Sequence, residues 1–294
     1  MLKEWTATAA LRRCAAFGAA VAMLCLPAAA SAHSGEFAKF NYCPSTTTGV
    51  SKCIQSVTKG GEIVLGSKKT PIVNEVTLQG GVGVPNPETH ISKFYGATNG
   101  VTLSKTPQPV PGGLLGIVPP ESSPPLVKLL SKFFFENSLT GVNATLELAG
   151  SASEIQLSSF NLLVGEETAL KLPVKIHLEN PFLGSSCYVG SNSAPIIWNL
   201  TTGTTNPPAG HTPMTGKPGF VEVIENEEIV KITENELVEN DWAAPAANGC
   251  GGILSFLVDP VIDAEIGLPS SAGVSSALLK NTIAQASVGS VNAH

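Results

Sequence analysis

The chain has 294 residues, 43% of them hydrophobic, and a formal net charge of −6. Both arginines, one lysine and one of the 23 acidic residues lie in residues 1–32, so the remaining 262 residues carry 14 lysines, no arginine and 22 acidic residues, a net charge of −8. Arginine is the usual bidentate ligand of phosphate, and an acidic chain repels polyanions. This composition therefore argues against binding of nucleic acids, nucleotides or anionic membrane surfaces.

Residues 1–32 have the features of a secretory signal peptide. A basic start precedes the uncharged, mostly small and apolar run Cys14–Ala30, and Ala30-Ser31-Ala32 offers small side chains to a signal peptidase. We predict cleavage near Ala32–His33 and a secreted, extracellular protein. The alternatives are a retained membrane helix, although the run is shorter than the ~20 residues that cross a bilayer comfortably, and a lipid anchor on Cys25. No later segment is long and apolar enough to be a transmembrane segment.

Four cysteines remain after such cleavage, namely Cys43, Cys53, Cys187 and Cys250. An even number in an exported chain predicts two disulfides. Of the three pairings we favour Cys43–Cys53, because these two are close in sequence, which leaves Cys187–Cys250 by elimination. A zinc site is the rival interpretation, but it lacks a Cys-x-x-Cys pair. A nucleophilic Cys187 is a weaker one.

Short segments in which apolar and polar residues alternate predict β-strands along residues 33–294. In the clearest, Leu170–Glu179, the even-numbered residues are Leu, Val or Ile, and Pro173 predicts an edge strand because proline cannot donate a backbone hydrogen bond. Further predicted strands are Ile72–Leu78, Gly100–Leu103, Val142–Leu148, Ile155–Leu163, Ile196–Leu200, Val221–Ile224 and Ile229–Thr233, with a last strand at Ala277–Ile283. Together they predict a single, mainly β domain, an antiparallel β-sandwich with one or two short helices.

A Pro-rich segment and two helices interrupt these strands. Residues 106–125 contain seven prolines and should form an extended loop rather than regular sheet. A short helix is expected over 124–136, with Leu126, Leu129, Leu130, Phe133 and Phe134 on one face. We expect this face to cover an open end of the sandwich, and a mobile lid or partner-docking helix is the alternative. A second helix is expected from Asp259-Pro260 to Gly267.

The segment from Glu222 to Asp241 holds seven Glu and one Asp among apolar residues and predicts an acidic hairpin. Carboxylates could bind calcium, but the segment lacks the clustered Asp and Asn and the turn Gly of calcium loops. We therefore expect a solvated face.

Motifs of catalysis are missing from the sequence: it has no His-Glu-x-x-His, no Gly-x-Ser-x-Gly and no Gly-rich phosphate loop. Its five histidines are His33, His90, His177, His211 and His294. We therefore predict no catalytic residue, no metal site and no cofactor. A Ser–His–Asp triad assembled from distant positions stays open, because geometry rather than order defines such triads.

Two segments resemble parts of uncharacterised secreted proteins of actinobacteria. They are Leu172–Tyr188, with the sequence LPVKIHLENPFLGSSCY, and Gly267–Gly273, with the sequence GLPSSAG. The resemblance implies export and brings no activity, cofactor or active-site residue with it.

The sequence thus favours a secreted, non-catalytic β-sandwich protein that acts as an extracellular structural or surface component or binds an unknown ligand. An exported hydrolase with a dispersed active site is the alternative. Solvated, unpartnered side chains at both His177 and His90 would dismiss it.

Overall fold

The computed structural model describes residues 33–116, 118–135, 139–224, 226 and 228–294. The predicted signal peptide and its cleavage site therefore lie at or beyond the start of the described residues. The strands are β1 (Lys52–Leu65), β2 (Lys68–Pro71), β3 (Val76–Val82), β4 (Ser92–Gly96), β5 (Pro107–Val110), β6 (Val142–Leu148), β7 (Gln156–Leu157), β8 (Leu170–Glu179), β9 (Tyr188–Val189), β10 (Ile196–Leu200), β11 (Phe220–Ile224), β12 (Ile229–Glu239), β13 (Ala247–Asn248) and β14 (Ser276–Ser287). The helices are α1 (Pro125–Phe135), α2 (Ser159–Val164), α3 (Ser255–Ile266) and α4 (Val288–Ala293), and the 3-10 turns are η1 (Gly35–Phe40), η2 (Gly113–Leu115), η3 (Ala152–Glu154) and η4 (Gly252–Leu254).

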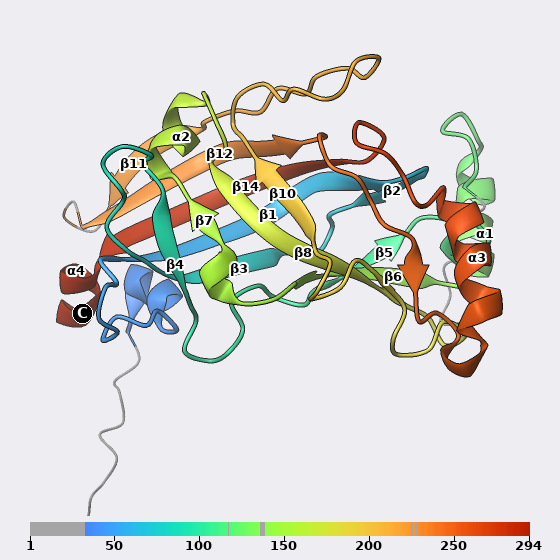
Figure 1. The fold of residues 1–294 in the computed structure, drawn as a ribbon, viewed down its shortest axis with the longest axis horizontal. Coiled ribbons are helices and arrows are strands. Elements are labelled where there is room, and N and C mark those ends of the chain that lie inside the picture. The colour runs from blue at the N-terminus through green and yellow to red at the C-terminus, as the bar shows by residue number, and fades with distance from the viewer. Residues whose placement is uncertain (1–32, 117, 136–138, 225, 227) are drawn as a thin grey trace, which may run out of the picture. The chain divides into compact units, whose positions relative to one another are not determined.

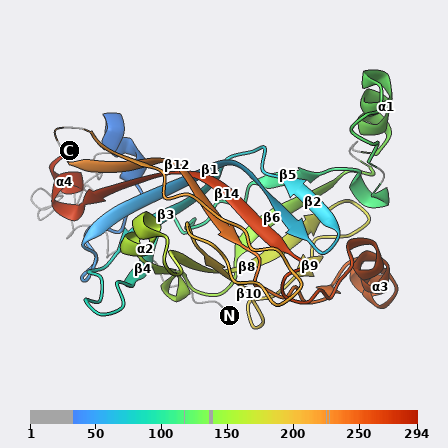
Figure 2. The same cartoon turned by 90° about the horizontal axis from the view of Figure 1, so that it is seen from above.

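All fourteen strands belong to one antiparallel sheet, whose main path runs β11-β12-β14-β1-β3-β4-β7-β8-β6-β5. Figure 1 shows β8 and β10 in front of β1 and β14. Figure 2, which is turned by 90°, shows that these two pairs of strands lie in separate layers, so the sheet folds back on itself. The short strand β4 makes the bend, since it pairs with β3 on one side and β7 on the other. The predicted mainly β, antiparallel fold is confirmed. The layering is compatible with a sandwich, although hydrogen bonds join the two layers through β4.

The longest strand, β1, was not predicted, and its irregularity explains why. It pairs with β14 over most of its length, but the register shifts between Thr58 and Gly60. Gly61 has φ +102°, and a Cβ there would lie 1.9 Å from the carbonyl oxygen of Leu278. Only glycine fits this bulge, which bends the strand and breaks the alternation of apolar and polar residues.

Strand β8 has the predicted bounds and burial alternation, but the prediction that it is an edge strand is wrong. It pairs with β6, β7, β9 and β10. Along one side of β8 the partner strand changes between Lys171 and Val174. Lys171 pairs with Gln156 of β7, and Val174 pairs with Leu148 of β6. Pro173 lies at this junction, where its carbonyl oxygen accepts a hydrogen bond from the amide of Ala149. The missing donor of proline therefore faces a gap between two partner strands.

Two other segments differ from their predictions for local reasons. The predicted strand Ile155–Leu163 is strand β7 followed by helix α2, because the Ser158 hydroxyl accepts a hydrogen bond from the amide of Asn161 and caps the helix. The Pro-rich segment 106–125 contains a strand after all. Strand β5 ends the sheet path, and an edge tolerates Pro107 and Pro109 because neither has a backbone N–H to offer.

The helices follow the predictions in part. Helix α1 spans Pro125–Phe135, and residue 136 lies outside the described residues. Helix α3 starts four residues before the predicted Asp259 and ends, as predicted, before Gly267. The Asp259 carboxylate accepts hydrogen bonds from the amides of Gly249 and Cys250 and so anchors the preceding loop instead of capping its own helix. Pro260 is the sixth residue of the helix, past its first turn, so the hydrogen bond that a backbone N–H there would donate to the Phe256 carbonyl is missing. No helix among the described residues is long and apolar enough to cross a membrane.

Both disulfides join the cysteines that the sequence favoured, Cys43 with Cys53 and Cys187 with Cys250. Cys53, Cys187 and Cys250 are fully buried. Disulfides of this kind are typical of oxidising environments.

Candidate functional site

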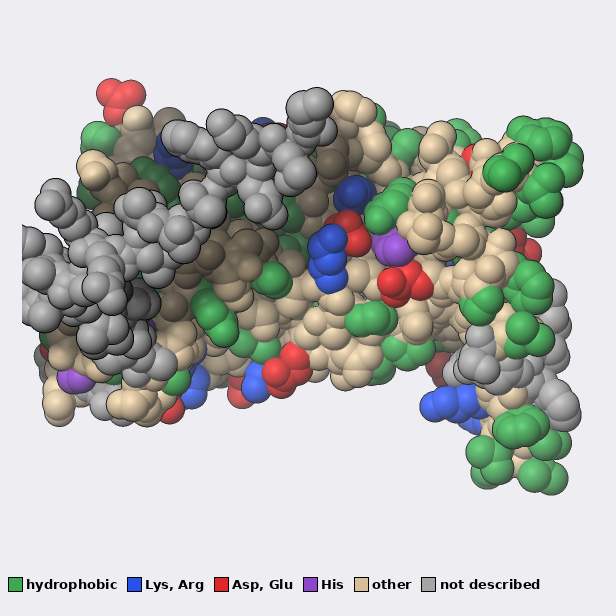
Figure 3. All heavy atoms as spheres, turned by 90° about the horizontal axis from the view of Figure 1, so that it is seen from below, with side chains coloured by type: hydrophobic (Ala, Val, Ile, Leu, Met, Phe, Trp, Pro, Cys, Tyr) green, Lys and Arg blue, Asp and Glu red, His purple; other side chains and the backbone are tan. Residues whose placement is uncertain are grey.

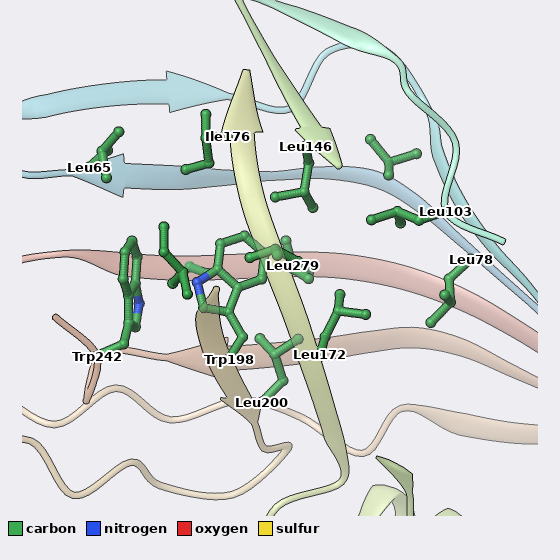
Figure 4. Packing of buried hydrophobic residues seen from close by; sticks show 14 of the residues in the cluster. Leu65, Leu78, Leu103, Leu146, Leu172, Ile176, Trp198, Leu200, Trp242 and Leu279 are labelled. Atoms are coloured by element: carbon green, nitrogen blue, oxygen red, sulfur yellow. The ribbon is translucent and has the colours of Figure 1, made fainter. Parts of the chain in front are cut away.

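An apolar cavity lies between the two layers of the folded sheet. Figure 4 shows β8 in front, with Leu172 and Ile176 directed toward side chains of the strands behind, among them Leu65 and Leu279. On β8 the residues that line the cavity are Leu170, Leu172, Ile176 and Leu178, those of the predicted apolar face. The opposite wall comes from β1, β3 and β14.

The lining of the cavity is extended along β8. Its lining follows β8 from Leu170 to Leu178, which at 3.3 Å per residue is a length of roughly 26 Å. Its free volume is about 100 Å³, several times the roughly 10–15 Å³ that one water molecule needs. It is also smaller than the roughly 150 Å³ of a cavity that holds benzene, so a hydrocarbon chain would enter this space only in part or as the surrounding side chains move apart.

One end of the cavity reaches the surface beside an ion pair. Lys68 at the start of β2 and Glu265 of α3 both line the cavity, their charged atoms are 2.6 Å apart, and both side chains are partly exposed. The turn η2 lies over this pair: a Cβ on Gly116, which has φ +62°, would be 2.0 Å from the Glu265 carboxylate. Apolar side chains of η2 and α3, Leu114, Ile262 and Ile266, line the same end.

Few polar groups line the remainder, and the buried side chains of Thr58, Gln108 and Asn281 have partners. The Thr58 hydroxyl donates to the Asn281 side-chain oxygen at 2.6 Å. The side-chain oxygen of Gln108 accepts from the amides of Val73 and Asn74, at 2.9 Å each, and so ties β5 to the chain before β3. Because these polar groups are already satisfied within the protein, the cavity offers a ligand mainly aliphatic contact.

A second cluster of side chains lies on the opposite, outer face of β6 and β8. His177 Nδ1 is 3.5 Å from a carboxylate oxygen of Glu179 and 3.8 Å from one of Glu147, and its ring stacks on Tyr188. Lys105 and Lys175 approach Glu147 to 3.2 and 3.5 Å. In Figure 3 a histidine side chain is visible among lysine and acidic side chains. Burial, and next the nearby Glu147 carboxylate, raise the pKa of Tyr188 above its ordinary value.

The two lysines of this cluster balance the charge of its two glutamates, but no nucleophilic side chain is bonded to its histidine. Among the described residues no Ser, Thr or Cys side chain hydrogen-bonds to His177, and its Nε2 is buried without a hydrogen-bond partner. The hydroxyl of Thr145, which lies opposite His177 in the sheet, donates instead to Glu179 at 2.9 Å. His90 is exposed and packs against Phe160 at 4.4 Å between ring centroids. Because His177 is buried beside carboxylates, the condition that would dismiss a hydrolase is not met, and the hydrolase stays a hypothesis without a visible nucleophile.

The acidic segment forms the predicted hairpin of β11 and β12. Two of its carboxylates have separate lysine partners: Glu222 lies 3.9 Å from Lys231, and Glu236 lies 3.1 Å from Lys217. Glu239 is buried, and its carboxylate accepts hydrogen bonds from the amides of Asn199 and Asp241. Within the described part of the chain, no three His, Cys, Asp or Glu side chains come together as metal ligands.

Sequence reasoning did not find the cavity. The alternation in Leu170–Glu179 identified which side chains face inward, but an apolar face looks the same whether its partners fill the space or leave it open. No family model, curated protein or solved structure matches this chain.

Proposed function

We propose that this chain is an exported, non-catalytic protein that binds an apolar molecule with a long hydrocarbon chain in the cavity between its two sheet layers. The observation that carries the proposal is the lining, in which aliphatic side chains of β1, β3, β6, β8 and β14 surround an unfilled space. Protein interiors are normally packed without such voids, and apolar pockets are the usual form of a ligand site.

The opening supports the same assignment. A hydrocarbon chain enclosed by β8 would leave its polar end beside Lys68 and Glu265, where the cavity reaches solvent. The buried length would then lose contact with water, which favours binding by about 0.8 kcal/mol for each methylene group. The signal-like residues 1–32 and the two disulfides support a place outside the cytoplasm.

Direct binding of palmitate and of hexadecanol to residues 33–294 tests the proposal. Native mass spectrometry should detect one bound molecule per chain, and the fluorescence of Trp198 and Trp242, the two tryptophans after residue 32, should change on titration. Ala144→Phe places a ring in the cavity and should abolish binding. Ala38→Phe makes the same change at an exposed position of η1 and should leave binding intact.

Binding of neither the fatty acid nor the alcohol to the wild type would refute the proposal. Equal binding by the Ala144→Phe variant, folded by circular dichroism, would refute the location.

A further inference from the structure

Helix α1 presents its apolar face to solvent, against the expectation that this face covers the sheet. Leu126, Leu129 and Phe133 are 64, 64 and 69% exposed, and Val127 and Leu130 nearly half. At 100° per residue these side chains cover an arc of about 160°, and Lys128, Ser131 and Lys132 lie on the other side. A wide apolar arc opposite lysines is the pattern of helices that lie in a membrane interface.

Helix α3 and the preceding turn η4 are apolar on two sides. Ile262 and Ile266 line the cavity, while Ile253, Phe256 and Val261 are 96, 70 and 64% exposed. The side of α3 that is turned away from the cavity therefore presents apolar side chains to solvent.

The carboxylates of α3 do not place free charge on its outward face. Asp259 and Asp263 accept hydrogen bonds from the backbone of residues 247–250, and Glu265 is paired with Lys68. The outward face of α3 is therefore neutral, and α1 adds two lysines.

Both helices lie at the same end of the folded sheet, on either side of the ends of β2 and β5 (Figures 1 and 2). Figure 3 shows hydrophobic side chains gathered at this end. The cavity opens here as well, since Lys68, Leu114 and Glu265 line it.

We propose that this end of the protein, with the exposed apolar side chains of α1, η4 and α3, docks on the surface of a lipid bilayer, from which the cavity takes up or delivers its hydrocarbon ligand. The second half of this statement rests on the proposed function. A bilayer fits better than a protein groove because the apolar side chains extend from two separate elements and, on α1, over a wide arc. The net charge of −8 disfavours anionic surfaces as a whole, and this end carries both signs: Lys128 and Lys132 lie on α1, while Glu121 before α1 and the carboxylates of α3 lie nearby.

Flotation with phosphatidylcholine vesicles, with and without phosphatidylglycerol, tests the docking. The wild type should float with both, because the apolar side chains rather than the lysines are the main contact. The double variants Leu126→Glu/Leu129→Glu in α1 and Phe256→Glu/Leu257→Glu in α3 should each reduce partitioning by at least about tenfold, because charged side chains replace groups that enter the interface. Phe220→Glu is the control, since Phe220 is 65% exposed on β11, away from α1 and α3.

Palmitate binding by the same variants in the absence of vesicles separates the two proposals. The docking is supported if the double variants in α1 and α3 bind palmitate normally but no longer float. These variants should also take up palmitate from vesicles more slowly than the wild type does. Flotation that survives both double variants, or no flotation of the wild type, overturns the docking while leaving the cavity to its own test. A lipid-free dimer that the double variants dissociate would show that a second copy covers this surface, and would likewise overturn it.

Discussion

Paired Leu→Phe substitutions measure whether the cavity is unfilled in solution. Leu172 lines the cavity, whereas Leu200 on β10 is fully buried and does not (Figure 4). A larger side chain in a filled core costs about 1–3 kcal/mol through strain. At Leu172 the added ring atoms enter free space, and burial gains of about 0.8 kcal/mol per carbon offset the adjustment. We expect Leu200→Phe to lower the free energy of unfolding by about 2 kcal/mol and Leu172→Phe to change it by less than about 0.5 kcal/mol.

Urea unfolding followed by the fluorescence of Trp198 and Trp242 provides the measurement, with equal slopes against urea as the condition for comparison. Leu172→Phe should also weaken palmitate binding, because the ring occupies the ligand's space. A cost at Leu172 as large as that at Leu200 would show that the space is closed in solution, and the reasoning from the cavity would fail.

Three further substitutions test other parts of the fold. Replacing Cys187 and Cys250 by Ala should lower the free energy of unfolding by about 4 kcal/mol, the loop-entropy value for a separation of 63 residues, as measured by urea unfolding beside a reduced wild type. Thr58→Val removes the donor to the buried Asn281 oxygen and should cost about 1–3 kcal/mol; a change near zero in the same assay would contradict this. Burial raises the pKa of Glu239, so the folded state binds its proton more tightly than the unfolded state does. The stability of the wild type relative to Glu239→Gln should therefore fall as pH rises from about 4.3 through the raised pKa, and an opposite or flat trend would contradict the burial argument.

The sequence predicted strands best where each has one wet and one buried face. Strands β6, β8 and β10 have the predicted bounds because their side chains alternate between cavity or core and surface. Alternation does not reveal a strand where the backbone departs from that repeat, as at the Gly61 bulge of β1. Alternation is also misleading where a local hydrogen bond determines the secondary structure. At Ser158 the capping serine starts a helix within an apolar run that resembles a strand.

The candidate site was less accessible to sequence reasoning than the fold. The inward face of Leu170–Glu179 was identified, but the free volume depends on the separation of two layers that the bend at β4 sets. The disulfide pairing was accessible because the short spacing of Cys43 and Cys53 left one partner for each remaining cysteine. The His177 cluster needed the register of β6 against β8, which places Thr145 opposite His177 and Glu147 opposite Lys175.

The failed expectation for α1 carries the most information about function. Natural sequences bury apolar faces, and exceptions concentrate at sites where another molecule supplies the missing contact. Exposed apolar side chains also occur elsewhere, as on α2 and β11, so their place beside the cavity is what distinguishes those of α1 and α3. The apolar faces of α1 and α3 come from chain segments more than a hundred residues apart, yet both lie at the end where Lys68 and Glu265 line an apolar cavity. An apolar route from a lipid surface into the protein requires both features at one place, because a hydrocarbon chain that crossed water between them would lose the stabilisation that the cavity provides.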